Sequence, residues 1–140
     1  MPFSTQWKIR FADVDPASIV FYPRYFEMLN GTVEDWFETM GYDFATMHRT
    51  LHRGVPTVRI ESQFLEPSEL GDIVEISITP THIGNSSCTI DFLMSCNGSV
   101  RLKATSTLVY MDLDARKSCP WPDDLRQKLL ETQGTPIAAG

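Results

Sequence analysis

The feature that most constrains the fold is one long amphipathic helix, predicted from Pro23 to Met40. Large apolar side chains recur there every three or four residues, which places them on one face of an α-helix. Pro23 suits the first helical position, and Gly41 suits the position just after a helix end. Because the apolar stripe carries aromatic residues along its whole length, the helix needs a large apolar partner. The stripe consists of Tyr25, Met28, Leu29, Thr32, Val33, Trp36, Phe37 and Met40.

Five segments of alternating apolar and polar residues can supply that partner. Alternation is the pattern of a β-strand with one buried face, and it occurs once before the helix and four times after it. The pair Asn97-Gly98 is a strong signal for a hairpin between the last two segments. Short connections favour an antiparallel sheet that is apolar on one side. The predicted inner face includes Phe3, Trp7, Ile9 and Phe11 in the first strand and Val58, Ile60 and Phe64 in the second.

Two shorter helices complete the prediction. Asp43 is placed to cap a helix that turns Phe44, Met47 and Leu51 inward and stops at Gly54. Pro122 favours the start of a last helix that has Leu125 and Leu129 one turn apart. Residues 133–140 have no pattern and are expected to be loose. The sequence therefore predicts one α+β domain over residues 1–132, with a five-stranded antiparallel sheet packed on one long central helix.

Composition excludes several classes of function. The 140 residues carry a formal net charge of −6, and the basic residues do not cluster, so a nucleic-acid partner is not expected. No apolar run approaches the roughly 18 residues that a membrane span needs, and the N-terminus has no signal-peptide pattern. The three cysteines have no metal-like spacing and are expected to be reduced, which favours a cytoplasmic protein.

The candidate chemistry lies just before the long helix. Asp13 and Asp15 close the first strand, and Tyr22 offers no side-chain oxygen to cap the helix start. Free N–H groups at a helix start suit a carbonyl oxygen that becomes negative during a reaction, and Asp15 is placed to act as base or nucleophile. The alternative is that Asp15, which precedes a proline, only forms an Asx turn. His48 and His52 have a spacing compatible with zinc, but no third ligand stands near them.

The stretch from Asp13 to Tyr25, DVDPASIVFYPRY, resembles the signature of the 4-hydroxybenzoyl-CoA thioesterase family of hotdog-fold proteins. The order of strand, long helix and four strands resembles that fold too. The pair of aspartates is also weakly similar to that of haloacid-dehalogenase-type phosphatases. That fold, however, needs a fully buried parallel strand where this chain alternates.

The thioesterase resemblance implies hydrolysis of an acyl-CoA or aroyl-CoA thioester without metal or cofactor. It makes Asp15 the catalytic carboxylate, as nucleophile or general base, and the backbone N–H of Tyr22 the donor to the thioester carbonyl. It also implies a homodimer, or a dimer of dimers, because the family's site lies between subunits. The exposed edge of a five-stranded sheet independently favours a homodimer.

Three features of the sequence depart from the family pattern. Ser18 stands where the family usually has Gly, which would adopt a positive φ more readily. The loop after the third strand has no Lys or Arg, so the CoA phosphates are expected to meet Arg59, Arg101 or Lys103, or else Asn85 and Ser86 at the turn. Asn30 takes the place of a helix acid that contacts the aromatic substituent in aryl-specific members, and Tyr25 is expected to line the acyl pocket.

The sequence thus predicts a thioesterase that acts on a benzoyl-type, hydroxybenzoyl-type or short acyl-CoA and releases free acid and CoA. The alternative is a non-catalytic hotdog domain that binds acyl-CoA or a protein. A dehydratase of the same fold would need a histidine in the acidic loop, and none stands there.

Overall fold

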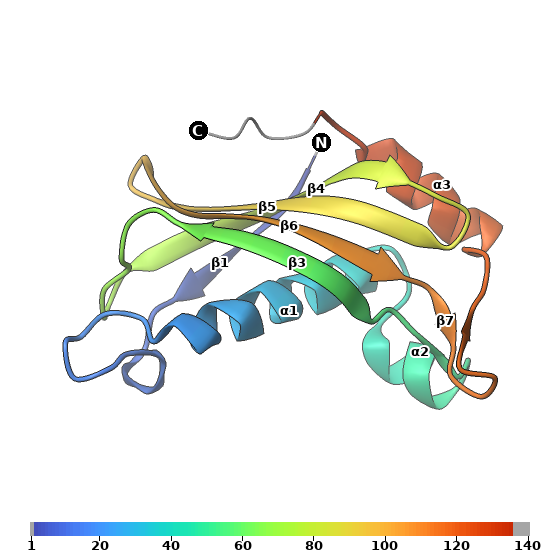
Figure 1. Cartoon of the computed structure of the whole chain (residues 1–140), viewed down its shortest axis with the longest axis horizontal. Helices are drawn as coiled ribbons and strands as arrows, with labels where there is room; N and C mark the ends of the chain where they lie inside the picture. Colours follow the sequence, from blue (N-terminus) through green and yellow to red (C-terminus); the bar gives the residue numbers. More distant parts are fainter. Residues whose placement is uncertain (1, 136–140) are drawn as a thin grey trace.

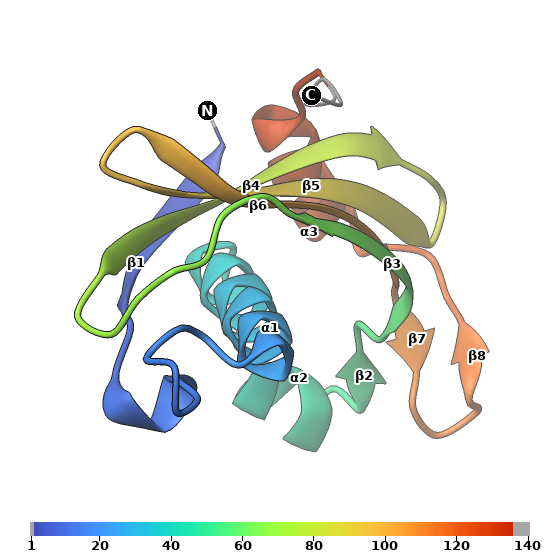
Figure 2. The same ribbon diagram turned by 60° about the vertical axis from the view of Figure 1, so that its left-hand side comes forward.

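A curved antiparallel sheet wraps around one long helix, α1 (Tyr22–Thr39), in the computed structural model, which describes residues 2–135 (Figures 1 and 2). The sheet has five strands in the order β1-β4-β5-β6-β3, and all neighbours are antiparallel. This arrangement confirms the predicted α+β hotdog fold. The strands are β1 (Phe3–Lys8), β3 (Thr57–Phe64), β4 (Ile73–Ile83), β5 (Ser87–Cys96) and β6 (Ser99–Val109).

The core lies between α1 and the concave face of the sheet. Every residue of the predicted stripe on α1 is buried, and so are alternate residues of the three central strands. Each large apolar side chain that is fully buried contributes roughly 1.5–3 kcal/mol relative to its exposed state. The helix and the sheet therefore stabilise each other. The central strands contribute Val74, Ile76, Ile78, Cys88, Ile90, Phe92, Met94, Leu102, Ala104 and Leu108.

The ends of α1 follow from local residues. The helix begins at Tyr22, one residue earlier than predicted, so Pro23 is its second residue. Phe21 precedes it in extended conformation and gives no side-chain cap. Gly41 follows the C-cap with φ of +85°, which confirms its predicted role in ending the helix.

The first strand ends earlier than the alternation indicates. β1 stops at Lys8, and a short 3-10 helix occupies Phe11–Asp13. The carboxylate of Asp13 accepts the N–H of Arg10 at 2.8 Å and turns the chain away from the sheet. The prediction for Phe11 was therefore wrong, because its side chain is 83% exposed.

The second predicted strand, β3, lies at the edge of the sheet and does not contribute the buried face expected of it. All its residues are exposed, including Val58, Ile60 and Phe64. As an edge strand it pairs with β6 on one side only, and a periodic sequence cannot distinguish an edge strand from a central one. This strand leaves an apolar sheet edge uncovered in the protomer.

The second helix, α2 (Phe44–Arg49), is capped by the Asp43 carboxylate as predicted, and it buries Met47. It ends before Leu51, which is exposed. Gly54 does not stop it but lies in β2 (Arg53–Gly54), which forms a small sheet with β7 (Met111–Asp112) and β8 (Lys117–Ser118). Strands of two residues carry no detectable periodicity, so this sheet could not be predicted.

The two histidines considered for zinc do not share a helix face. His52 follows the end of α2 and contacts the carboxylate of Asp114, whereas a ring nitrogen of His48 contacts the carbonyl of Phe44. Within residues 2–135, the His, Cys, Asp and Glu side chains form no group of three that could hold a metal ion.

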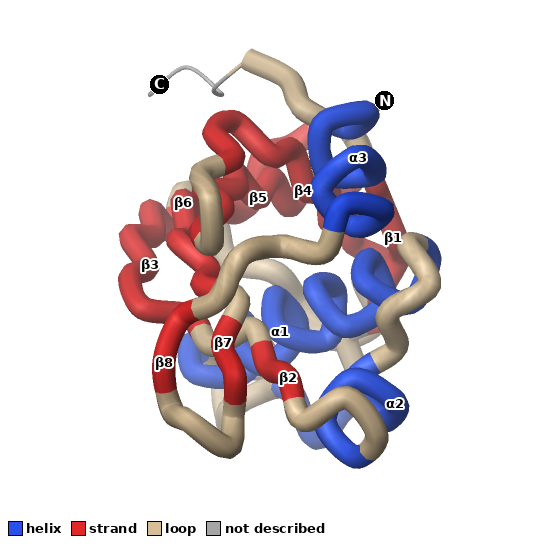
Figure 3. The backbone as a smooth tube through the Cα atoms, turned by 90° about the vertical axis from the view of Figure 1, so that its right-hand side faces the viewer, coloured by secondary structure: helices blue, strands red, loops and turns tan. Residues whose placement is uncertain are grey.

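The last helix, α3 (Asp123–Thr132), packs beside β4 at the C-terminal end of α1 (Figure 3). Leu125 and Leu129 are fully buried, as predicted, and Lys128 Nζ donates to the Met40 carbonyl at 2.8 Å. Gln133 and Gly134, the first residues of the predicted tail, hydrogen-bond to carbonyls of β4. Residues 136–140 of that tail lie outside the described residues.

The contact of α1 with β1 depends on the absence of a side chain at Gly31. A Cβ there would lie 2.9 Å from two ring atoms of Trp7, whose indole N–H is held by Thr32 Oγ1 at 3.2 Å. We expect Gly31→Ala to lower the free energy of unfolding by about 1–2 kcal/mol, because overpacking outweighs the gain in helix propensity. Urea denaturation measures this change.

Asp35→Ala is the matched control for that experiment, since Asp35 is exposed on the same helix. It gains helix propensity without a new contact and is expected to be neutral or slightly stabilising. Equal stabilisation by both substitutions would show that Trp7 does not limit the approach of α1.

Candidate active site

Asp15 lies in a tight loop that brings the chain back to the start of α1. Val14 and Val20 form an antiparallel bridge across the base of the loop. Within it, the N–H of Asp15 donates to the Ile19 carbonyl and the N–H of Ser18 donates to the Asp15 carbonyl, both at 2.9 Å. These bonds close a small hairpin, and the loop that contains it leads into the N-terminus of α1 at the left of Figure 1.

The Asp15 carboxylate forms the Asx turn that was the alternative interpretation of the sequence. Its Oδ1 accepts the N–H of Ala17 at 2.8 Å, while Oδ2 accepts no hydrogen bond from the described residues. The side chain is half-buried. One oxygen therefore fixes the orientation of the carboxylate, and the other stays available for chemistry, so turn and catalytic roles are compatible.

Ser18 adopts the conformation for which the family usually employs glycine. Its φ is +63°, in the left-handed region. The serine thus keeps the hairpin geometry at a local cost of roughly 1–2 kcal/mol. The departure at this position is therefore compatible with a closed hairpin.

The start of α1 presents a backbone donor. The N–H of Phe21 donates to the Asp13 carbonyl at 2.9 Å, and that of Arg24 donates to the Phe21 carbonyl at 2.8 Å. Pro23 has no N–H, and the N–H of Tyr22 meets no acceptor among residues 2–135. The positive end of the helix dipole adds to this donor, so the position favours a developing negative charge.

An open apolar cleft of about 250 Å³ adjoins this donor. Tyr22 and Tyr25 line it from α1, and Phe64 lines it from the end of β3. The ring centroid of Phe64 lies 5.7 Å from that of Tyr25 and 6.5 Å from that of Tyr22. Tyr25 is buried, and its hydroxyl accepts the N–H of Ser68 at 3.2 Å. The aromatic walls suit a flat apolar group.

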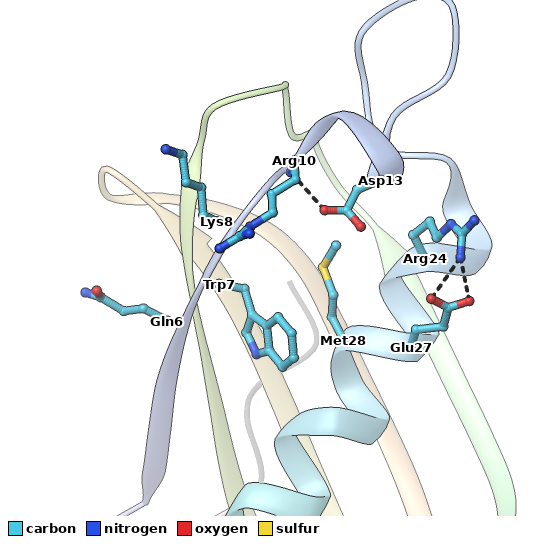
Figure 4. Close-up of a pocket in the computed structure, with 8 residues that line it drawn as sticks. All are labelled: Gln6, Trp7, Lys8, Arg10, Asp13, Arg24, Glu27 and Met28. Atoms are coloured by element: carbon cyan, nitrogen blue, oxygen red, sulfur yellow. Dashed lines mark hydrogen bonds and ion pairs between the residues drawn. The ribbon is translucent and has the colours of Figure 1, made fainter.

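Asp13 belongs to a different cleft, shown in Figure 4. This cleft of about 490 Å³ lies between β1 and the face of α1 that carries Arg24 and Glu27, which pair at 2.9 Å. Asp13 is held there by its bond to the Arg10 N–H. Tyr22 and Tyr25 line the other cleft, so the Asp13 side chain belongs to a different cleft although the Asp13 carbonyl binds the N–H of Phe21.

Four of the predicted substrate-binding residues lie away from Asp15 within the protomer. Asn30 is exposed on α1, and its Nδ2 donates to Glu34 at 3.3 Å. Asn85 and Ser86 lie in the turn between β4 and β5, and their carbonyls accept the N–H groups of Trp121 and Tyr110. This turn and the Asp15 loop lie at opposite ends of the molecule (Figure 1). The fourth, Arg59, is exposed on β3 and pairs with Glu61.

Arg101 is not placed to bind a CoA phosphate. Its side chain is only 13% exposed and donates to the Asp72 carboxylate, the Pro67 carbonyl and Ser68 Oγ. It holds the segment Glu66–Asp72, which we call the platform, since the Asp15 loop rests on it. The turn residues of the platform were visible in the sequence, but its contacts with Arg101 and the loop are long-range and left no local signal.

Comparison with known proteins assigns the family. Residues 9–129 match the thioesterase-like superfamily. A 1,4-dihydroxy-2-naphthoyl-CoA hydrolase of Nostoc punctiforme is 26% identical over 129 residues, which cover 92% of this chain and 87% of that one. The chain therefore belongs to the thioesterase-like superfamily, which confirms the prediction of a thioester hydrolase.

Solved structures show the same fold. A 1,4-dihydroxy-2-naphthoyl-CoA thioesterase from Synechocystis superposes with a TM-score of 0.85 at 20% identity, covering 94% of this chain and 97% of that chain. A Staphylococcus aureus protein in complex with CoA superposes with a TM-score of 0.89 at 12% identity, covering 99% and 90%. None of the helices within residues 2–135 has the length and apolar character to span a membrane.

The left-handed conformation of Ser18 generates a stability prediction. We expect Ser18→Gly to raise the free energy of unfolding by up to about 1 kcal/mol, because relief of the left-handed cost exceeds the extra chain entropy of glycine. Ser18→Val is expected to lower it by about 1–3 kcal/mol, since a β-branched residue resists this conformation more strongly. Thermal unfolding monitored by circular dichroism measures both changes.

Ala17→Gly, at the neighbouring loop position without positive φ, is the matched control and is expected to destabilise by about 0.5–1 kcal/mol. A loss of stability in Ser18→Gly similar to that in Ala17→Gly would contradict the backbone assignment at Ser18.

Proposed function

We propose that this protein hydrolyses an aroyl-CoA thioester, with Asp15 as the catalytic carboxylate and the Tyr22 N–H as the donor to the thioester carbonyl. The observation that carries the proposal is the position of Asp15 in a closed hairpin that leads into a helix start whose first N–H meets no acceptor among the described residues. A carboxylate and a proposed carbonyl-binding donor thereby stand seven residues apart, one on the loop and one at the start of the helix that follows it.

The proposed reaction uses these two groups in sequence. The carbonyl oxygen of the thioester accepts the Tyr22 N–H, and the helix dipole stabilises the negative charge that develops on it. Oδ2 of Asp15 either attacks the carbonyl carbon or removes a proton from an attacking water molecule. The thiolate of CoA then leaves, and in the first route water hydrolyses the acyl-enzyme intermediate.

An aromatic acyl group is the substrate class that we favour over a short aliphatic one. The cleft next to Tyr22 is walled by Tyr25 and Phe64, whose rings offer faces and edges to a flat group. The naphthoyl-CoA hydrolases similar to this chain act on an aroyl-CoA by name. A benzoyl or hydroxybenzoyl group, as the resemblance to the 4-hydroxybenzoyl-CoA thioesterases implies, also fits such a cleft.

We further propose that the complete site forms between two copies of the chain. The uncovered edge of β3 has Phe64 near the α1 start at one end and Thr57 at the other. Antiparallel pairing of two β3 edges would bring the Thr57 end of one copy beside the Phe64 end of its partner. Arg59, Asn85 and Ser86 of one subunit would then approach the other subunit's helix start, where CoA is expected. Assembly into a dimer of dimers stays a prediction.

Replacement of the carboxylate tests the chemistry. We expect Asp15→Asn to lower turnover by on the order of 10²–10⁴, because the amide is neither a base nor a nucleophile, while its oxygen can still accept the Ala17 N–H. Steady-state rates with benzoyl-, 4-hydroxybenzoyl-, 1,4-dihydroxy-2-naphthoyl- and short aliphatic CoA measure the loss and rank the acyl groups.

Asp13→Asn is the matched control, since Asp13 faces the other cleft, and it is expected to keep its turnover. Normal turnover by Asp15→Asn would refute the assignment of Asp15. Binding of CoA without turnover of any thioester by the unmodified protein would favour the non-catalytic alternative.

A charge on the uncovered edge tests the assembly. Ile60→Lys is expected to give single chains in sedimentation experiments and to reduce turnover, because a lysine in the middle of an edge strand opposes pairing with a second edge. The matched control is Gln6→Lys on β1, the other edge of the sheet, which is expected to keep the dimer. A monomeric unmodified protein with full activity would overturn the shared site.

A further inference from the structure

The side chain of Arg101 is the centre of a hydrogen-bond network under the active-site loop. One of its terminal nitrogens, Nη1, lies 2.8 Å from Asp72 Oδ2, 3.1 Å from the Pro67 carbonyl and 3.3 Å from Ser68 Oγ. Its backbone carbonyl accepts the N–H groups of Leu65 and Glu66. Arg101 therefore contacts both ends of the platform, residues 66–72, from strand β6.

The platform in turn supports the loop that carries Asp15. The carbonyl of Ser68 accepts the N–H of Val20 at 2.9 Å, and the N–H of Leu70 donates to the Ser18 carbonyl at 3.1 Å. Ile19 also forms an antiparallel bridge with Glu69. Three consecutive loop residues, at positions 18, 19 and 20, are thus fixed to the platform, immediately after the Asx turn of Asp15.

The same platform reaches the acyl cleft. The N–H of Ser68 donates to the hydroxyl of Tyr25, whose ring lines the cleft beside the Tyr22 donor. Ser68 is fully buried, so this contact is shielded from water. The platform therefore connects the loop of the carboxylate with the wall of the binding site.

We infer that Arg101 is a positioning residue for the reaction: it holds the platform in the one arrangement that places Asp15 and Tyr25 correctly. This inference rests on the proposed function, since it assigns to Arg101 the task of orienting the proposed catalytic carboxylate. Arg101 acts through the platform and does not itself touch the substrate.

The geometry explains why arginine occupies this position. The carboxylate of Asp72 accepts hydrogen bonds from the guanidinium and from the N–H of Glu69, and it thereby links the second half of the platform to Arg101. The guanidinium also offers a second donor, Nε, which lies 3.4 Å from Ser99 Oγ while Nη1 serves the platform. A lysine ammonium is a single compact donor group and cannot serve both places in a fixed geometry. The hydrogen bond with Asp72 also raises the pKa of Arg101, in agreement with a permanently charged group.

The first test separates positioning from stability. We expect Arg101→Gln to lower kcat for the best aroyl-CoA by about 10- to 100-fold with little change in KM, because small displacements of a catalytic group have large effects on rate. Arg101→Lys is expected to recover part of the loss, since it restores the charge beside Asp72. The control is Lys128→Met, which removes another cation bound to a backbone carbonyl, at the far end of α1, and is expected to leave kcat unchanged.

The second test asks whether Arg101 acts through the Asp15 loop. Residues that act as one unit show non-additive effects. Arg101→Gln in the Asp15→Asn background is therefore expected to cause a much smaller fold-loss than in the unmodified protein. Hydrogen exchange gives a readout that does not need activity: the amides of Val20 and Leu70 are expected to exchange faster in Arg101→Gln, while those in the middle of β5 keep their protection.

These outcomes distinguish the two claims. Full turnover by the single variant Asp15→Asn would overturn the proposed function. Hydrogen exchange at Val20 and Leu70 would then still test whether Arg101 holds the platform. An equal fold-loss in both backgrounds, unchanged exchange at Val20 and Leu70, or a loss of kcat in Lys128→Met equal to that in Arg101→Gln would each overturn the positioning role of Arg101.

Discussion

The structure depends on the burial of one helix face against one sheet face. The stripe of α1 contributes the largest buried side chains, Trp36 and Phe37 among them, and the central strands have their apolar positions on the facing side. Because neither element can bury this surface alone, helix and sheet form together or not at all. The burial also fixes the direction of α1, so that its N-terminus always emerges at the same end of the sheet. The positions of the Asp15 loop, the platform and the cleft all follow from that direction.

The proposed chemistry is built from backbone groups more than from side chains. Apart from the Asp15 carboxylate, the essential parts are an N–H at a helix start and a hairpin closed by main-chain hydrogen bonds. Such a site tolerates a wide range of side chains, provided that the backbone path is kept. Ser18 illustrates this, because it adopts a positive φ in a position where glycine is usual and the hairpin still closes. The main chain alone does not hold the platform in place against strand β6. The ion pair between Arg101 and Asp72 does this.

Sequence reasoning succeeded wherever the controlling interaction was local or periodic. It identified the stripe of α1, the cap at Asp43, the turn at Asn97-Gly98 and the buried face of the last helix. It failed where contacts that the periodic pattern does not encode decide which side chains are buried. The exposure of β3 depends on its place at the sheet edge, and Phe11 is turned outward by the bond between Asp13 and Arg10. Arg101 was visible as a basic residue on a strand, but nothing near it in the sequence indicates its platform contacts. The Asx turn at Asp15 and the start of α1 near Pro23 were local and could be foreseen, whereas Phe64 as a wall of the cleft could not.

The placement of α3 has a consequence for how this protein can change over evolutionary time. α3 closes the C-terminal end of α1, where Lys128 binds the Met40 carbonyl and Leu125 and Leu129 are fully buried. The cleft lies at the opposite end, where Tyr22 and Phe64 are exposed and Tyr25 is buried. Substitutions that remodel the cleft therefore start from a scaffold that is anchored elsewhere. Substitutions at the cleft end can therefore change the acyl group that is bound, while the contacts of α3 at the other end maintain the stability of the fold.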